Sequence, residues 1–447
     1  MVFKFIRYTQ PGWQLNILPV SAKKFASCYV HEADIPDGFL DTRFQAKSAQ
    51  LADAGYHLCL KGKLLQSTRE DITQQEMLPP PTLKDEYAFL RKYWGTPWAT
   101  FALTLRLFTF KNPFKEVYAY LSTSHIKRIN AFQQPFIDES YTNFQSPLVA
   151  SAPLVGVIIP TLNRYLYLKD VLHDLEQQSY KNFEVLVYDQ SDNFDLAFYK
   201  QFSVNIVVHN QKEKLLWTAR NNAIKATTAE YLLFFDDDSR VDEHWIAEHL
   251  KCLDFYNADI SAGVSLASSG QKIPASYSYF RWADQFDSGN AMVKRHVFTQ
   301  IGLFNEQFNG QRMGDGEFGY RAYLNGFTSI SNPKAPRVHL KVNSGGLREM
   351  GSWDGFRPKK WFAPKPVPSV VYLFKKYLSK PLYKNALLIG IMLSNVPYKH
   401  KRSSKMLAVS IALTIVKSPV LLIQLYRSRK IAQKMLNSGK TPELLQK

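Results

Sequence analysis

The sequence predicts an α/β fold, in which a largely buried sheet is flanked by helices. The apolar, β-branched run 154–159 is followed by Pro160, as expected for a buried parallel strand. Apolar residues then recur at helical spacing in 165–178, and similar segments alternate as far as residue 266. Alternating strands and helices indicate a doubly wound sheet, whose ligands bind beyond the carboxyl ends of the strands.

The remaining elements of this region follow from the same periodicities. Expected strands are 183–188, 204–208, 231–235 and 259–266, and expected helices are 217–225 and 242–253. Before them, residues 1–150 form short mixed segments, with helices predicted in the aromatic-rich stretch 87–129 and a proline-containing linker at 133–153. We therefore divide the chain into an accessory region 1–150, an α/β domain 151–350 and a helical tail 357–447.

Composition narrows the class of protein. The chain has 447 residues, of which 45% are hydrophobic and 14% aromatic, so a disordered or low-complexity chain is excluded. Its three cysteines, Cys28, Cys59 and Cys252, form neither a disulfide framework nor a metal-binding spacing. This usage predicts a reducing, cytoplasmic environment.

The positive charge is confined to the tail. The whole chain has a formal net charge of +18, and residues 357–447 contain 19 Lys and Arg but one acid, Glu443. A nucleic-acid enzyme usually surrounds its active groove with basic residues. Confinement to one end instead favours contact with an anionic membrane surface.

The tail also contains an apolar run, 406–426, as long as the roughly 20 residues needed to cross a bilayer. Lys417 lies near its centre, where insertion costs about 2.5–3.5 kcal/mol, and Pro419 follows. The polar residues gather on one side of a helical projection: Ser410, Thr414, Lys417, Ser418 and Gln424. This pattern favours a helix lying in the headgroup region, with a packed helical hairpin and a true span as alternatives. No signal peptide is expected in residues 1–20.

Polar groups follow three predicted strands: 161–164, 189–192 and 236–238. The last group consists of three consecutive aspartates, whose mutual repulsion in a partly dry site raises at least one pKa unless a cation is bound. Mg²⁺ or Mn²⁺ would relieve that repulsion and bridge a diphosphate. The alternative is an acidic turn that caps the helix expected near Asp242.

A second acidic group, Asp315-Gly316-Glu317, lies in a glycine-rich segment at a predicted helix start. Asp315 is either functional or a plain helix cap. Further along, His339, Lys341 and Arg348 surround Gly345-Gly346, as in a segment that closes on phosphates. Metal, cations and a separate carboxylate together suit a reaction in which a diphosphate leaves and a hydroxyl loses its proton. The sequence has no G-x-S-x-G, H-E-x-x-H or P-loop motif.

These motifs, in this order, resemble glycosyltransferase family 2, the inverting nucleotide-sugar transferases of the GT-A fold. The resemblance covers roughly 154–348. Segment 157–164 is similar to the family's first strand and nucleotide-binding loop, which implies Thr161, Asn163 and Arg164 as nucleotide contacts. Asp189 resembles the acid that contacts the base, although the following residue is Gln190 where the common form has a second acid.

The resemblance implies further roles. Arg220 and Asn221, in Ala219-Arg220-Asn221, would line the nucleotide pocket. Asp236-Asp237-Asp238 resembles the D-x-D motif, which implies Asp238 as main metal ligand, with Asp236 or Asp237 near ribose and sugar. His339 fits a downstream metal ligand.

The acceptor side is implied by 302–306 and 314–321. Counting back from Arg321 places the catalytic base at Asp315, preceded by Gly314 where the family usually has Glu. The remaining acceptor or lid candidates are Trp217, Trp282, Glu317, Arg321, Lys341 and Arg348.

The resulting prediction is a metal-dependent inverting glycosyltransferase that uses a nucleotide-sugar donor and a glycan or lipid-diphosphate-linked acceptor. Its tail would hold it on the inner face of the cell membrane during bacterial-type surface polysaccharide synthesis. A nucleotidyltransferase, or a non-catalytic membrane or nucleic-acid adaptor, are the alternatives. A nucleotidyltransferase would be expected to carry a glycine-rich loop after the first strand, where this chain has Pro-Thr-Leu-Asn-Arg at 160–164. An adaptor would give the aspartates no function.

Overall fold

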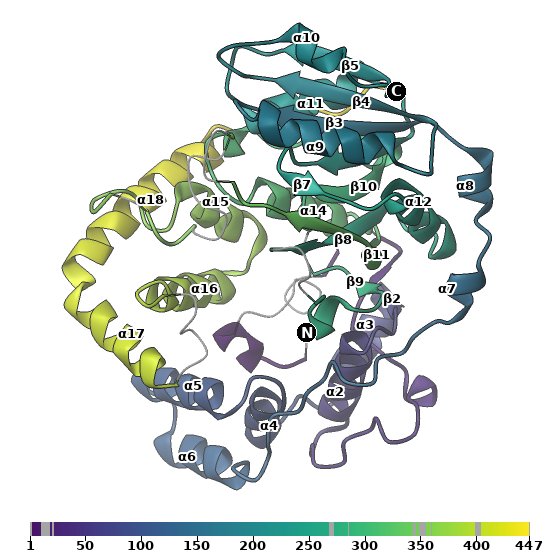
Figure 1. The fold of residues 1–447 in the computed structure, drawn as a ribbon. Helices are drawn as coiled ribbons and strands as arrows, with labels where there is room; N and C mark the ends of the chain where they lie inside the picture. The colour runs from purple at the N-terminus through teal and green to yellow at the C-terminus, as the bar shows by residue number, and fades with distance from the viewer. Residues whose placement is uncertain are drawn as a thin grey trace. The chain divides into compact units, whose positions relative to one another are not determined.

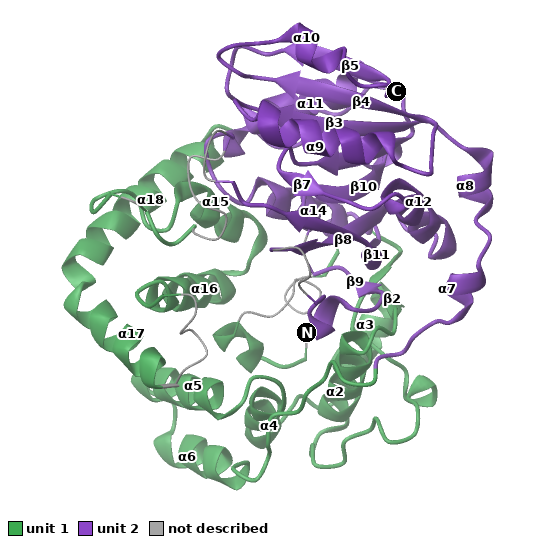
Figure 2. Ribbon diagram, in the orientation of Figure 1, with its two compact units in different colours: residues 1–134, 352–439 green, residues 135–351, 440–447 purple. Residues whose placement is uncertain are grey.

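The computed structural model describes residues 2–9, 18–19, 22–267, 272–284, 286–342, 346–347, 355–358, 360–397 and 404–446. It has two compact units, shown in Figure 2: unit 1 is 1–134 with 352–439, and unit 2 is 135–351 with 440–447. The accessory region and most of the basic tail thus belong to the same unit. Arg348 lies outside the described residues.

Unit 2 is built on one mixed sheet of nine strands with the order β5-β4-β3-β6-β10-β8-β11-β7, and β9 pairs with β11 (Figure 1). Its strands are β3 Val155–Thr161, β4 Phe183–Asp189, β5 Ile206–Asn210, β6 Tyr231–Phe235, β7 Ser239–Arg240, β8 Ile260–Leu266, β9 Arg281–Trp282, β10 Asn290–Lys294 and β11 Ser329–His339. Strands β5, β4, β3 and β6 are parallel, whereas β10 runs antiparallel to β6. The predicted α/β class is confirmed, and the antiparallel strand makes the sheet mixed.

The main helices of unit 2 alternate with these strands. They are α9 Tyr165–Glu176, α10 Leu196–Tyr199, α11 Leu216–Ala226, α12 Trp245–Phe255, α13 Arg295–Ile301 and α14 Gly314–Leu324, preceded by α7 Ser140–Asn143 and α8 Pro147–Ser151 in the predicted linker. Pro160 does not end the first strand as expected. It lies inside β3, opposite Tyr188, because β3 pairs with β4 along its whole length but with β6 only as far as Ile158.

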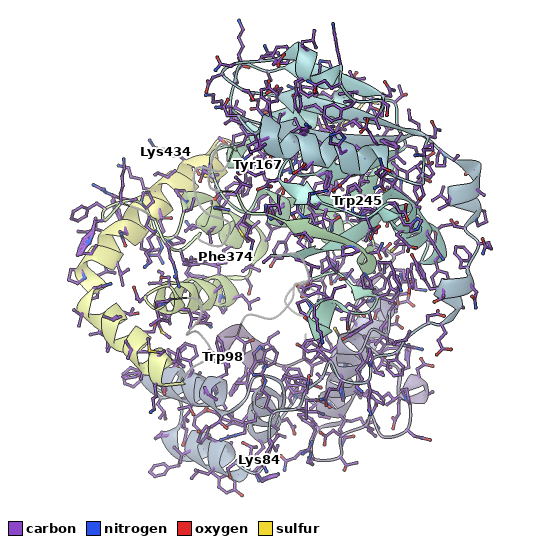
Figure 3. All side chains as sticks on the ribbon, viewed as in Figure 1. Lys84, Trp98, Tyr167, Trp245, Phe374 and Lys434 are labelled. Atoms are coloured by element: carbon purple, nitrogen blue, oxygen red, sulfur yellow. The ribbon has the colours of Figure 1, made fainter. Side chains whose placement is uncertain are left out.

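The core of unit 2 fixes the strand that precedes the three aspartates. All five residues of β6, whose sequence is YLLFF, are buried, as expected for a strand covered on both faces. Trp245, labelled in Figure 3, is fully buried with its ring centroid 4.4 Å from that of Phe235. Its indole Nε1 donates a 2.8 Å hydrogen bond to Asn290 Oδ1. The residues that follow β6 are therefore attached to a strand that is held by buried contacts.

Unit 1 begins with β1 Lys24–Ala26, paired with β2 Gln66–Thr68, and five helices. The helices are α2 Lys47–Leu60, α3 Arg69–Glu76, α4 Leu83–Tyr93, α5 Thr96–Phe108 and α6 Pro113–Ser122. Phe3 stacks on Phe89 of α4 with ring centroids 3.9 Å apart. Glu86 accepts 2.8 Å hydrogen bonds from the amides of Lys4 and Phe5, so α4 anchors the start of the chain.

The tail contributes α15 Pro368–Tyr377, α16 Lys380–Leu393, α17 Ser404–Val416 and α18 Ser418–Asn437 to unit 1. The apolar run expected as one helix is broken at Lys417, because Pro419 cannot donate a backbone hydrogen bond to the preceding turn. Within the described residues, no single helix has the length and hydropathy to span a membrane, whereas the pair 405–416 and 418–437 passes that test together but is bent by 79°.

Only part of the polar side of the tail is buried, since Lys417 and Ser418 are exposed. Ser410 and Gln424 are buried, and Gln424 Nε2 donates a 2.5 Å hydrogen bond to the carbonyl of Trp361. In contrast, Val416 and Leu422 are 76% and 66% exposed. The two helices therefore bury Ser410 and Gln424 in unit 1 and expose apolar side chains beside their basic residues.

Candidate active site

Three side chains beyond the strand ends form the group most suited to a cation. One ligand atom from each of Asp236, Asp238 and His339 lies within 4.8 Å of the others. The two aspartates follow β6, and His339 is the last residue of β11, which pairs with β7 through His339 and Ser239. Two carboxylates and an imidazole are ligands that Mn²⁺ and similar ions accept. The fold thus brings together the three residues predicted as metal ligands.

Asp236 is held by two buried arginines. Arg220 Nη2 lies 3.0 Å from Asp236 Oδ1, and Arg337 Nη1 lies 2.8 Å from Asp236 Oδ2. Arg337 also contacts Asp287, with 3.0 Å between Nη2 and Oδ2, and its own side chain is 1% exposed. Each guanidinium group contacts one carboxylate oxygen of Asp236, so the orientation of this carboxylate is fixed from two sides.

Arg337 was not among the residues predicted from the sequence. It lies in the long strand β11, at the position where pairing with β8 resumes after a register irregularity that begins at Asn332. Strand β11 has the sequence SISNPKAPRVH, so no apolar periodicity sets Arg337 apart and no local signal would have suggested it.

Asp237 contacts the loop after β3. Thr161 Oγ1 donates a 2.8 Å hydrogen bond to Asp237 Oδ2, and Arg164 Nη1 donates one of 2.9 Å to Oδ1. Burial raises the pKa of Asp237 to about 6, with a further contribution from the neighbouring Asp238 carboxylate, against the lowering effect of Arg164. Two predicted nucleotide contacts are therefore engaged with the aspartate motif in this structure.

Asp238 is held toward His339. His339 Nε2 lies 3.2 Å from Asp238 Oδ1, and the amide of Val342 donates a 3.2 Å hydrogen bond to Oδ2. Burial disfavours its charged form, but the hydrogen bond and charge of His339 together with the Arg164 charge outweigh burial, so the pKa of Asp238 lies below its ordinary value. An ionised carboxylate beside an imidazole suits metal ligation.

The segment after β11 contacts the loop that follows β3. Arg164 Nη2 donates a 3.0 Å hydrogen bond to the Val342 carbonyl, and the amide of Gly346 donates one of 2.8 Å to the Leu162 carbonyl. A Cβ on Gly346 would lie 2.5 Å from the Arg164 guanidinium carbon. Lys341, predicted as a lid residue, adopts a left-handed backbone with φ of 54° within this segment.

Asp189, at the end of β4, is fully buried and engaged by two tyrosines. The Tyr165 and Tyr199 hydroxyls donate to its Oδ2 at 2.5 and 2.8 Å. Next to it, Gln190 accepts a 2.6 Å hydrogen bond from the Leu215 amide through Oε1. Asn163 Nδ2 donates one of 2.8 Å to Asp192 Oδ2. These contacts join the loops after β3 and β4, where the base was predicted to bind.

Helix α14 begins against Trp217. A Cβ on Gly314 would lie 2.4 Å from two carbons of the Trp217 ring, which explains glycine where the family usually has Glu. Asp315 follows in the first turn, with Oδ1 accepting a 2.8 Å hydrogen bond from the Gly316 amide. Trp217 is itself 5% exposed, and its Nε1 donates a 3.1 Å hydrogen bond to the Phe308 carbonyl.

Successive contacts connect this helix start with the aspartates. The ring of Trp217 lies under the Arg220 guanidinium, with 5.2 Å between the guanidinium carbon and the ring centroid, and Arg220 pairs with Asp236. Gly289 also packs closely against Asp236, since a Cβ added at position 289 would lie 2.2 Å from Asp236 Oδ2.

The other predicted acceptor-side residues have structural contacts. Glu317 is buried and pairs with Arg321 at 3.2 Å, and Arg321 Nη2 donates a 2.8 Å hydrogen bond to the Leu303 carbonyl. Asn221 Nδ2 donates to the Phe304 carbonyl at 2.9 Å. Trp282 lies in β9, opposite Ile330 of β11, and is 8% exposed. These contacts stabilise the loop and sheet around the site, and the predicted substrate roles of these residues stay predictions.

Residues 156–322 match the family model described as "Glycosyl transferase family 2". The chain carries a family 2 glycosyltransferase domain. The enzyme is therefore a glycosyltransferase, and the strand-end aspartates and Asp315 of α14 lie inside the matched range.

Three known proteins illustrate the similarity. A PGL/p-HBAD biosynthesis glycosyltransferase of Mycobacterium bovis is 24% identical over 226 residues, which cover 45% of this chain and 79% of that protein. The putative teichuronic acid biosynthesis glycosyltransferase TuaG of Bacillus subtilis is 29% identical over 93 residues, 20% of this chain and 37% of that protein. The solved structure of S. aureus TarS 1–349 in complex with UDP-GlcNAc is 18% identical, covers 61% of this chain and 80% of that chain, and has a TM-score of 0.42.

Proposed function

We propose that this glycosyltransferase transfers a sugar, with inversion and metal dependence, from a nucleoside-diphosphate donor to a hydroxyl of a glycan or lipid-linked acceptor. The observation that carries the proposal is the convergence of Asp236, Asp238 and His339 beyond the strand ends of a family 2 domain. The names of the similar mycobacterial and Bacillus proteins support a role in surface glycan or polysaccharide synthesis. Both the nucleotidyltransferase and the adaptor alternatives lack comparable support.

A divalent cation, Mn²⁺ or Mg²⁺, would be held by Asp238 and His339, with Asp236 completing the set. When bound, such an ion neutralises the charge that develops on the departing diphosphate. Arg220 and Arg337 hold Asp236 in place, and Arg164 adds positive charge beside Asp237 and Asp238. Asp238 is already ionised at neutral pH, since its pKa is below the ordinary range.

Asp315 would act as the general base. A carboxylate in the first turn of α14 is stabilised by the positive end of the helix dipole. It would take the proton of the acceptor hydroxyl as that oxygen attacks the anomeric carbon from the side opposite the diphosphate, which inverts the configuration. The packing of Gly314 against Trp217 fixes the backbone that carries this carboxylate.

The base assignment is tested with Asp315→Asn. We expect loss of transfer and nearly unchanged donor affinity, measured by product formation and by calorimetry with a panel of sugar nucleotides. Asp170→Asn, in α9, is the matched control. The Asp170 carboxylate is half exposed, and its contact with Arg240 is long, with 4.0 Å between Oδ2 and Nη1, so its loss should have little effect. Near-normal turnover of Asp315→Asn would disprove the role.

Metal dependence is tested separately. With the preferred nucleoside diphosphate present, Mn²⁺ should raise the melting temperature of the wild type and of Asp170→Asn but not of Asp238→Asn. An equal shift in all three proteins would exclude the proposed ligand set. The anomeric configuration of the product, read by NMR, tests inversion.

We also propose that the enzyme associates peripherally with the inner face of the cell membrane. Two observations support this. Residues 357–447 contain 19 basic residues and one acid, and α17 and α18 expose apolar side chains. Replacing the exposed Arg429, Lys430 and Lys434 by Glu should shift the protein to the soluble fraction at low salt. Equal membrane retention of this variant and the wild type would contradict the proposal.

A further inference from the structure

Helix α6 of unit 1 exposes the face that a surface helix normally buries. Phe114, Val117, Tyr118 and Leu121 have the spacing of one helical stripe, and they are 85%, 38%, 65% and 58% exposed. The buried side of the same helix contains Glu116 and Ala119. The outward direction of the stripe therefore needs a physical reason.

The inner side of α6 is fixed by a buried carboxylate. Glu116 pairs with Arg106 of α5, with 2.5 Å between Nη2 and Oε1, and accepts a 2.8 Å hydrogen bond from the Tyr87 hydroxyl. Arg106 in turn lies over the Phe5 ring, 4.5 Å from its centroid. Rotating α6 to bury its aromatic side would take Glu116 away from these partners. The stripe is thus exposed because the opposite side of α6 makes specific buried contacts. It is not exposed because α6 is loosely attached.

The turn between α5 and α6 continues this apolar surface. Phe108 and Phe110 are 77% and 98% exposed, and Phe110 has a left-handed φ of 56° that directs the chain around the turn. We call Phe108, Phe110, Phe114, Val117, Tyr118 and Leu121 the aromatic patch. Figure 1 shows that α6 lies at the edge of unit 1, beyond α4 and α5.

The exposed charged residues in the segment that carries the patch have one sign. Lys111 and Lys115 are exposed and flank Phe114, whereas residues 87–137 contain a single acid, Glu116, which is buried. Exposed aromatic rings interleaved with lysines, without an exposed carboxylate, match the requirements of an anionic lipid surface: rings enter the acyl boundary while ammonium groups reach phosphates. A protein partner would be expected to require more directional polar groups at the rim.

We propose that the aromatic patch is a second membrane-binding element, inserting Phe108, Phe110 and Phe114 into the headgroup region of an anionic bilayer. It is separate in sequence from the basic tail. The inference concerns attachment of unit 1 and does not depend on which sugar the enzyme transfers.

The test is flotation of the full-length protein with vesicles of phosphatidylglycerol and phosphatidylcholine, without donor or metal. Replacing Phe108, Phe110 and Phe114 by Ser should lower the partition coefficient at least tenfold. Met77→Ser, which removes another exposed apolar side chain of unit 1 (79% exposed), should leave it within twofold. Lys111→Glu with Lys115→Glu should weaken binding to these vesicles more than to purely phosphatidylcholine vesicles.

A second measurement locates the contact. An environment-sensitive fluorophore on Thr109→Cys should shift to the blue when anionic vesicles are added, relative to wild type treated identically and to the same label on Met77→Cys. Unchanged partitioning of the triple variant together with an unshifted label would overturn the proposal. A change in oligomeric state of that variant, with unaltered vesicle binding, would assign the patch to self-association instead. Hydrolysis of the donor should be the same in the triple variant and wild type, which separates this test from that of the transferase mechanism.

Discussion

Arg337→Ala gives the sharpest test of how the site is held together. Its guanidinium contacts Asp236 at 2.8 Å, Asp287 at 3.0 Å and the hydroxyls of Ser239 and Ser265 at 3.0 and 2.8 Å. Because the side chain is 1% exposed, water does not replace these bonds fully when the guanidinium is removed. Breaking a buried ion pair by removing one partner costs about 3–5 kcal/mol.

The matched comparison is Arg240→Ala in the same unit. Arg240 forms a bidentate pair with Asp174, with 2.7 Å from Nε and from Nη2 to the two carboxylate oxygens, but its side chain is 46% exposed. Exposed pairs contribute roughly 0.2–1 kcal/mol, and Asp174 keeps a hydrogen bond from the Val241 amide at 3.1 Å. Arg240 contacts both oxygens of Asp174, whereas Arg337 makes a single contact with Asp236, so pair geometry alone would favour the exposed pair. A larger loss for Arg337→Ala would therefore come from its burial and its additional buried partners.

Thermal and urea unfolding followed by tryptophan fluorescence measure the difference. For a unit of this size about 1 kcal/mol corresponds to 2–4 °C, so Arg337→Ala should lower the melting temperature by roughly 6–20 °C and Arg240→Ala by no more than about 4 °C. Donor affinity should also fall for Arg337→Ala, since Asp236 loses one of its two arginines. Equal destabilisation by the two substitutions would refute the argument that burial of the Asp236–Arg337 pair organises the site.

Three further changes have defined outcomes. Gly314→Ala should destabilise unit 2 by about 1–3 kcal/mol in urea unfolding, because its Cβ would lie 2.4 Å from Trp217; adding Trp217→Leu should restore part of the loss, and no rescue would disprove the steric cause. Gly289→Ala should weaken donor binding in calorimetry at least tenfold through the displaced Asp236 carboxylate, and unchanged affinity would show that this carboxylate is not needed for the donor. Burial raises the pKa of Glu86 to about 7, so the folded state holds a proton that the unfolded state releases, and the free energy of unfolding of unit 1 should fall as pH rises from about 5 to 8, by at most roughly 3 kcal/mol from this group. Glu86→Gln should flatten that slope, and an identical slope in the variant would contradict the assignment.

Local sequence patterns are sufficient to predict the α/β class, the position of strand β6 and the residues that follow it. Apolar runs and their periods are local properties, since a strand buried on both faces needs continuous apolar residues whatever its neighbours are. For the same reason the order of the motifs was sufficient to identify the family 2 domain. Three features emerge only from the folded chain: the antiparallel insertion of β10, the pairing of Asp236 with Arg337 and the need for glycine at 314 beside Trp217. Each of these depends on contacts between residues far apart in the chain, and no local pattern encodes such contacts. The same holds for α6: its apolar stripe is visible in the sequence, but the buried Glu116 pair that directs it outward exists only once α4, α5 and α6 have packed.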